Sequence, residues 1–222
     1  MFLIIDCGSK KTGLICSIIA QAGYQYEMAF LFNPGEKEND RINLQTFPDD
    51  LKSSVLLLTD RNNRIEELKI LEESFSRYSG IILSGGGILK NREAEYSNLF
   101  SALKEISNPI LGICFGFQII GIIYGAKLSS MKDMDNKKRS IKQLNNSILF
   151  KDVDDLTLFQ ENHREEITLP DAFIQIATSE KCEIEAMEHK EKPVFGVQFH
   201  PEASGKMGEK LINNFCGIAE KR

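Results

Sequence analysis

Short apolar runs alternate with helical patterns in the first part of the chain. Residues 2–5 form an apolar run that ends at Asp6, and residues 12–22 carry apolar positions at helical spacing. Gly23 is a natural end for this helix, because glycine adopts the left-handed conformation there without steric cost. Residues 24–31 then have the pattern of a second strand. A strand, a helix and a strand in this order predict the start of an α/β domain.

The same order of strand and helix recurs further along the chain. Apolar strand candidates at residues 80–84 and 109–113 each run into a turn that contains glycine. Amphipathic helix patterns lie at residues 62–77, 92–106 and 118–124. Repeated units of this kind indicate a parallel sheet with helices on both of its faces.

The pattern changes after Gly125. Residues 132–139 are strongly charged and predict a loop. Short β-like segments follow, with few helical stretches between them, at residues 156–160, 173–178, 184–188 and 194–199. They predict antiparallel additions to the sheet rather than a separate domain. With a last amphipathic helix over residues 206–219, the expected fold is a single three-layer α/β/α domain over residues 1–222, with a mostly parallel central sheet.

Composition narrows the class of protein without indicating a function. The chain has 222 residues, of which 42% are hydrophobic and 27% charged, and its formal net charge is −5. An acidic balance disfavours a nucleic-acid partner, because proteins that bind nucleic acid carry basic patches. No apolar stretch approaches the roughly 20 residues of a membrane span, and the N-terminus lacks the pattern of a leader. We therefore expect a cytoplasmic protein with neither a membrane nor a nucleic acid as its partner.

One of the five cysteines stands out by its surroundings. The five are scattered and odd in number, which argues against a disulfide framework. Cys114 follows an apolar strand and is flanked by Gly112 and Gly116, which permit the tight turn that lifts a nucleophile clear of a sheet. The N-terminus of the following helix would stabilise its thiolate. The alternative is a small buried cysteine between a strand and a helix, which is our interpretation of Cys7, Cys16, Cys182 and Cys216.

A second candidate is the histidine at the end of the last predicted strand. His200 follows the apolar segment 194–199, and Glu202 lies two positions further. A base and the carboxylate that orients it have this arrangement in a catalytic triad, in which Cys114 would supply the nucleophile. Taken alone, a histidine and a glutamate at this spacing are more often a surface pair. The interpretation therefore depends on Cys114.

Three glycines in series follow another predicted strand. Gly85, Gly86 and Gly87 come directly after Ser84. Successive glycines allow backbone N–H groups to point into a cleft and to form an anion hole. A phosphate-binding loop is a competing interpretation, but its G-x-x-x-x-G-K-[ST] pattern is absent from the sequence. A flexible turn is the third.

Two long motifs connect these candidates to a family. Residues 109–118 and 195–202 resemble the motifs of the class I, triad-type, glutamine amidotransferases, with Cys114 and His200 in the right order and 86 residues apart. Three further segments are most similar to the glutaminase domain of GMP synthase, namely residues 4–15, 80–86 and 176–187. The resemblance covers nearly the whole chain and implies the flavodoxin-like three-layer fold of the class.

The resemblance also implies a role for each matching residue. Cys114 would attack the side-chain amide of L-glutamine, and His200, oriented by Glu202, would protonate the departing ammonia and then activate water. Backbone N–H groups of Gly86 and Phe115 would hold the oxyanion. The implied substrate-binding residues are Gly85, Gln118 and His163. This half-reaction is expected to need no metal and no organic cofactor.

The sequence departs from the family pattern in three places. Gly87 stands where the family usually has a proline, which predicts a looser oxyanion loop. The Ser-His-Gly-Asp segment of the family reads Asn-His-Arg-Glu at residues 162–165, where only His163 matches, either as a pocket residue or as an ordinary loop histidine. The chain is longer than a minimal glutaminase ahead of Ile81, and we expect an insertion around residues 33–60.

The ammonia acceptor is not evident in the sequence. The glutaminase domain of GMP synthase usually accompanies an ATP pyrophosphatase domain, and no nucleotide-binding motif is visible here. We therefore expect the ammonia to pass to a separate synthase, such as an ATP pyrophosphatase subunit. Two other hypotheses stay open: a freestanding hydrolase of γ-glutamyl compounds or small carboxamides, and a regulatory module without activity. The presence of all three triad residues disfavours the last.

Overall fold

A mixed sheet of nine strands runs through the part of the chain that this computed structural model describes, residues 1–31, 73–87 and 89–221. Five strands are parallel to one another, in the order β2 (Tyr26–Phe30), β1 (Phe2–Cys7), β3 (Gly80–Gly86), β4 (Ile110–Ile113) and β11 (Val194–Val197). Four antiparallel strands continue the sheet, in the order β10 (Ala186–His189), β9 (Phe173–Thr178), β6 (Lys138–Gln143) and β7 (Thr157–Gln160). A separate pair is formed by β5 (Leu128–Asp135) and β8 (His163–Ile167).

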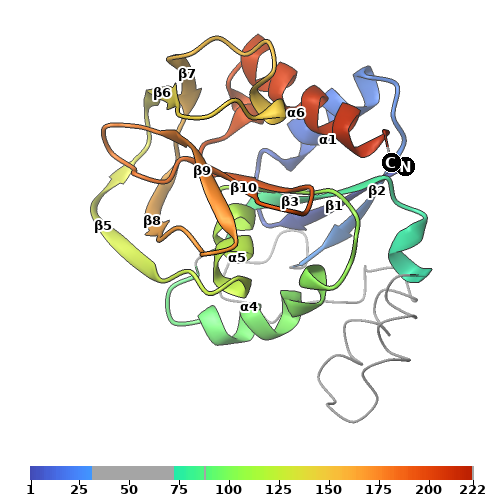
Figure 1. The fold of residues 1–222 in the computed structure, drawn as a ribbon, viewed down its shortest axis with the longest axis horizontal. Coiled ribbons are helices and arrows are strands. Elements are labelled where there is room, and N and C mark those ends of the chain that lie inside the picture. The colour runs from blue at the N-terminus through green and yellow to red at the C-terminus, as the bar shows by residue number, and fades with distance from the viewer. Residues whose placement is uncertain (32–72, 88, 222) are drawn as a thin grey trace.

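Helices cover both faces of this sheet (Figure 1). One face carries α1 (Thr12–Gln21) and α6 (Lys206–Ala219), and the other carries α4 (Glu93–Phe100) and α5 (Phe115–Ile123). Three short 3₁₀ helices, Ser101–Lys104, Ile148–Phe150 and Pro201–Ala203, complete the described elements. The predicted three-layer architecture, with antiparallel additions in the second half, is confirmed.

Burial explains why the parallel strands were recognisable as apolar runs. The side chains of Leu3 and Ile4 face opposite sides of the sheet, and neither is exposed to solvent. Ile81 and Ile82 in β3 repeat this arrangement. A parallel strand covered by helices on both faces has no polar side, and its sequence is therefore continuously hydrophobic.

One prediction from the sequence is wrong. The charged stretch 132–139, predicted as a loop, contains the end of β5 and the beginning of β6. Most side chains of β5 are exposed, because its only strand partner is β8 and the two form a small sheet of their own. An exposed strand has no apolar face to reveal it in the sequence. Cys7, interpreted as a loop residue, is likewise the last residue of β1.

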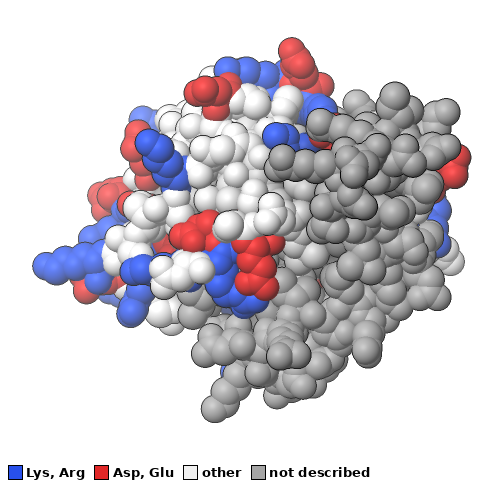
Figure 2. Space-filling model, turned by 90° about the horizontal axis from the view of Figure 1, so that it is seen from below, with Lys and Arg blue, Asp and Glu red and all other residues white. Residues whose placement is uncertain are grey.

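Two other predictions fall wholly or largely outside the described residues. The insertion expected around residues 33–60 lies there, as does most of the helix predicted over 62–77, of which residues 73–76 are described and helical. Within the part of the chain that is described, no helix combines the length and the apolar character needed to cross a membrane. On the described part of the face that carries α4, basic and acidic side chains are intermixed (Figure 2).

The start of α5 packs directly onto the sheet. A Cβ atom built on Gly116 would lie 2.4 Å from the carbonyl oxygen of Leu83 in β3, and one on Gly112 would lie 2.5 Å from the carbonyl oxygen of Gly116. Both distances are shorter than real Cβ contacts, so only glycine allows the helix and the strands to approach this closely. The two glycines that flank Cys114 in the sequence are thus the point where strand and helix touch.

We expect Gly116→Ala to lower the free energy of unfolding by at least about 2 kcal/mol, because the added methyl group would collide with backbone that cannot easily move. Gly13→Ala is the matched control, since nothing lies within 4 Å of a Cβ at that exposed helical position. It should leave the free energy of unfolding unchanged or raise it by up to about 1 kcal/mol. Urea unfolding of both variants measures the difference, and equal effects would contradict this account.

Candidate active site

Cys114 occupies a strained turn between β4 and α5. Its φ is 51° and its ψ is −103°, a region that non-glycine residues rarely adopt. The backbone N–H of Cys114 donates to the carbonyl of Val197 at the end of β11, 2.8 Å away, and its own carbonyl accepts from the N–H of Gln118. The thiol is thereby held at the N-terminus of α5, where the helix dipole favours a thiolate.

His200 and Glu202 lie just beyond the end of β11, in and before the 3₁₀ helix Pro201–Ala203. Nδ1 of His200 is 2.6 Å from Oε1 of Glu202, and both residues are buried. The N–H of His200 donates to the carbonyl of Gln160 in β7, and the hydroxyl of Ser204 donates to the carbonyl of His200. The imidazole is therefore fixed on both its side-chain and its backbone sides, with Nε2 left to act on a neighbouring group.

The thiol and the imidazole meet beside Gly85. A Cβ atom built on Gly85 would lie 2.8 Å from Cε1 of His200 and 3.5 Å from Cβ of Cys114. Gly85 therefore leaves the space in which the carboxyl ends of β3, β4 and β11 bring the two side chains together. In this resting geometry the sulfur is not aligned with Nε2 for a standard hydrogen bond, as is common before a substrate binds.

Electrostatics favour the charged imidazole. Burial alone lowers the pKa of His200, but hydrogen bonding with Cys114 and with Glu202, together with their charges, outweighs it and raises the pKa to about 10. An imidazolium next to a sulfur stabilises the thiolate form. By contrast, burial raises the pKa of the thiols of Cys7, Cys16, Cys182 and Cys216, which makes them poor nucleophiles. This agrees with their interpretation as packing residues.

The glycine loop lies next to the thiol. Gly86 is the last residue of β3, and Phe115 is the first residue of α5, so its N–H has no partner within the helix. Gly87 has a φ of +47°, which proline cannot adopt, and the ring of Phe115 packs against it where a Cβ would stand. The loop is thus built around glycine at this position, and the oxyanion roles of Gly86 and Phe115 stay predictions.

A carboxylate that the sequence treated only as a mismatch holds the far side of this loop. The two side-chain oxygens of Glu165 accept hydrogen bonds from the backbone N–H groups of Leu89 and Lys90, at 3.1 and 3.0 Å. Glu165 lies in β8 and is buried. A bidentate acceptor of this kind ties the glycine loop to β8. The acidic residue that the family has at this place was the signal that could have identified it.

The two remaining predicted residues lie under the site. Nε2 of Gln118 donates to the carbonyl of Glu165 and to Oε1 of Gln198, at 2.9 and 3.1 Å, so its amide holds β8 against α5. His163 is buried as the first residue of β8, and its Nδ1 is 3.0 Å from the same carbonyl. Their contact with a substrate stays a prediction. The described residues contain no group of three or more His, Cys, Asp or Glu that could hold a metal ion.

The raised pKa of His200 gives a direct test of the pair with Glu202. We expect Glu202→Gln to lower the midpoint of the His200 imidazole titration by at least about one pH unit, because an opposite charge stabilises the imidazolium. Imidazole NMR resonances measure it, with His200 assigned by its loss in His200→Gln. His189, which lies outside the site, is the internal control. An unchanged His200 midpoint would show that Glu202 does not set its charge.

Comparison with known proteins agrees with this geometry. The family model "Glutamine amidotransferase class-I" matches residues 3–218. The glutamine-hydrolyzing subunit of the GMP synthase of Methanosarcina mazei is 40% identical over 144 residues, which cover 64% of this chain and 74% of that protein. The corresponding GMP synthase subunit of Pyrococcus abyssi is 37% identical over 156 residues, 69% of this chain and 80% of its own.

Two solved structures share the fold at low sequence identity. A Thermoplasma acidophilum protein has a TM-score of 0.74 at 22% identity, covering 99% of this chain and 94% of its own. A glutamine amidotransferase of Thermotoga maritima has a TM-score of 0.63 at 19% identity, covering 100% of this chain and 84% of its own. With a family match over nearly its whole length and a cysteine, histidine and glutamate gathered at the ends of its parallel strands, the chain belongs to the class I glutamine amidotransferase family.

Proposed function

We propose that this protein is a glutaminase subunit, which hydrolyses L-glutamine to glutamate and ammonia and passes the ammonia to a separate synthase. The observation that carries the proposal is the convergence of Cys114 and His200 beside Gly85, with Glu202 bonded to the other ring nitrogen. A thiol, a base and an orienting carboxylate are what amide hydrolysis through a thioester requires.

The reaction proceeds in two halves on these residues. The thiolate of Cys114 attacks the side-chain carbonyl carbon of glutamine, and the oxyanion that forms is held by the N–H groups of Gly86 and Phe115. His200 gives its proton to the leaving nitrogen, so the carbon–nitrogen bond breaks and ammonia departs from a γ-glutamyl thioester. His200 then takes a proton from water, which attacks the thioester and releases glutamate and the thiol.

The comparisons support the class of partner. The relatives from Methanosarcina mazei and Pyrococcus abyssi are each named as one lettered subunit of a GMP synthase, which implies a companion subunit. We propose that the acceptor is an ATP pyrophosphatase subunit that uses the ammonia to aminate a nucleotide. A freestanding γ-glutamyl hydrolase is the alternative, motivated by Arg164, which is exposed and departs from the family pattern.

Glutamate release from the purified chain, with and without the candidate synthase subunit, ATP and its nucleotide, tests this function. We expect a slow basal rate that rises at least about tenfold with the complete partner, since the partner orders the site for turnover. Cys114→Ala should lose at least about 1,000-fold of kcat, whereas Cys16→Ala, which removes a buried thiol from α1, should keep it. A rate that the partner leaves unchanged, with γ-glutamyl amides turned over faster than glutamine, would favour the freestanding hydrolase.

The Glu165 contact with the glycine loop makes a second prediction. In Glu165→Gln an amide NH₂ replaces one acceptor of the two backbone N–H groups, and the loop loses a hydrogen bond next to the oxyanion site. We expect kcat to fall about tenfold with KM little changed, because the oxyanion forms only during the reaction. Glu166→Gln, at the neighbouring position whose carboxylate accepts from Ser129, is the control and should stay within about twofold of wild type. Equal effects of the two changes would argue against the clamp.

A further inference from the structure

Two glutamates that the proposed reaction does not use are buried behind the site. Glu161, just ahead of β8, and Glu185, just ahead of β10, have no exposed surface. None of their four side-chain oxygens lies in standard hydrogen-bond geometry with a donor from the described residues. The two carboxyl groups nevertheless face each other closely enough to form a hydrogen bond, and the hydroxyl of Ser179 faces Glu185. Such a pair needs a proton between its members, because two bare carboxylates would only repel each other.

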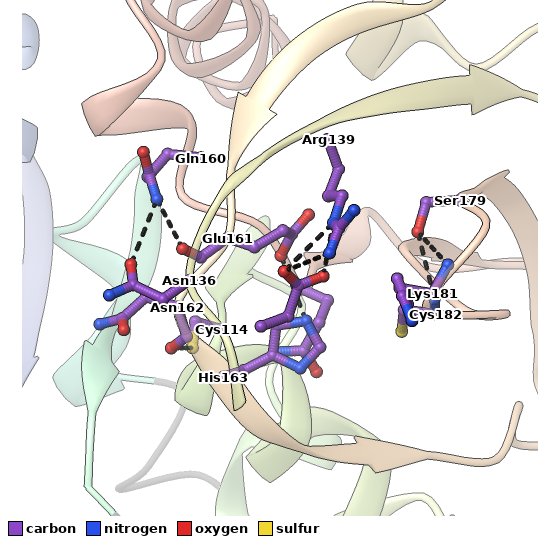
Figure 3. Close-up of polar contacts among 12 residues, drawn as sticks. Cys114, Asn136, Arg139, Gln160, Glu161, Asn162, His163, Ser179, Lys181 and Cys182 are labelled. Atoms are coloured by element: carbon purple, nitrogen blue, oxygen red, sulfur yellow. Dashed lines mark hydrogen bonds and ion pairs between the residues drawn. The ribbon is translucent and has the colours of Figure 1, made fainter. Parts of the chain in front are cut away.

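Glu161 belongs to a segment that touches both reacting residues. On one side of it, the carbonyl of Gln160 accepts the N–H of His200 at 2.8 Å. On the other side, the carbonyl of Asn162 lies 3.8 Å from Sγ of Cys114. The side chain of Glu161 extends away from Cys114 and toward Arg139 (Figure 3). The segment 160–163 therefore contacts the active site through its backbone, while Glu161 reaches into the interior.

The surroundings of the pair favour one negative charge rather than two. Burial, and then the charge of Glu161, raise the pKa of Glu185 well above its ordinary value. The only nearby arginine of the described chain, Arg139, is already bound to both oxygens of Asp135. Nε2 of His163 lies 3.2 Å from Oε2 of Glu161 but is not aligned for a hydrogen bond. Cys182 and Glu166 are the other titratable groups of this region.

We propose that Glu161 and Glu185 share one proton, and that this carboxyl–carboxylate hydrogen bond holds the segment 160–163 in place against Cys114 and His200. Glu161 is then a positioning residue that acts through its backbone neighbours, and Glu185 is the partner that fixes it to β10. The kinetic part of this inference rests on the proposed glutaminase function. Its structural part, the shared proton, does not.

The shared proton gives the folded protein a defined dependence on pH. Because the folded state binds the proton of Glu185 more tightly than the unfolded chain does, its stabilising effect is complete below the ordinary glutamate pKa and is lost as the pH rises. Glu185→Gln supplies an N–H donor to Glu161 without titrating. The thermal midpoint of Glu185→Gln should therefore exceed that of wild type by a margin that grows from about pH 5 to about pH 9.

The active-site part is tested by the alkylation rate of Cys114 with chloroacetamide, measured by peptide mass spectrometry, together with kcat for glutamine. We expect Glu185→Gln to stay within about twofold of wild type and Glu185→Ala to lose about tenfold in both rates, because the segment loses its anchor. Rescue by glutamine but not by alanine distinguishes positioning from a general loss of structure. Glu183→Ala, at an exposed position two residues away, is the matched control and should behave as wild type.

The inference is overturned if Glu185→Ala alkylates Cys114 at the wild-type rate, if Glu185→Gln is as slow as Glu185→Ala, or if the difference in thermal midpoint does not change with pH. Should Glu185→Ala fail to fold, Glu161→Gln repeats the test from the other side of the pair. It should also stay near wild type in alkylation and show the same growing margin in thermal midpoint. If wild type hydrolyses no glutamine, the proposed function fails, while alkylation and thermal midpoint still decide whether the pair positions the segment.

Discussion

The turn at Cys114 is the constraint on which the rest of the site depends. A positive φ at a non-glycine residue costs about 1–3 kcal/mol and persists only where its surroundings fix it. Here Gly112 and Gly116 allow the turn to lie against β3, and the Cys114 N–H is bound by Val197 at the end of β11. The same turn exposes the thiol at the start of α5 and brings it to the end of the strand that leads to His200. Strain, packing and reactivity therefore have one origin.

Carboxylates position the groups around this turn. Glu202 holds the imidazole, Glu165 holds the backbone of the glycine loop, and the proposed Glu161–Glu185 pair holds the segment between β7 and β8. Each of the first two is buried with N–H groups as its partners, which stabilise a carboxylate without a neighbouring cation. Acidic side chains thus fix the site from three directions, and the thiolate reacts among groups that are already in place.

The parallel half of the fold could be predicted from the sequence more fully than the other half. β1, β3 and β4 are buried on both faces, so an apolar run followed by a glycine turn marks each of them. β5 and the start of β6 are exposed and charged, and they pair with segments far along the chain, so neither composition nor alternation marked them. The role of Glu165 was missed for a related reason, because the loop that it holds lies 75 residues away in sequence.

The sequence by itself determined the parts of the site whose physics is local. Glycines on either side of a cysteine define a tight turn, and a histidine with a glutamate two residues on defines a base with its orienting acid. Only the tertiary structure decided that these parts meet beside Gly85, that the imidazole is held charged, and that Glu161 and Glu185 face each other out of water. These outcomes depend on strand register and on desolvation, which are set by contacts between distant segments and not by neighbours in the chain.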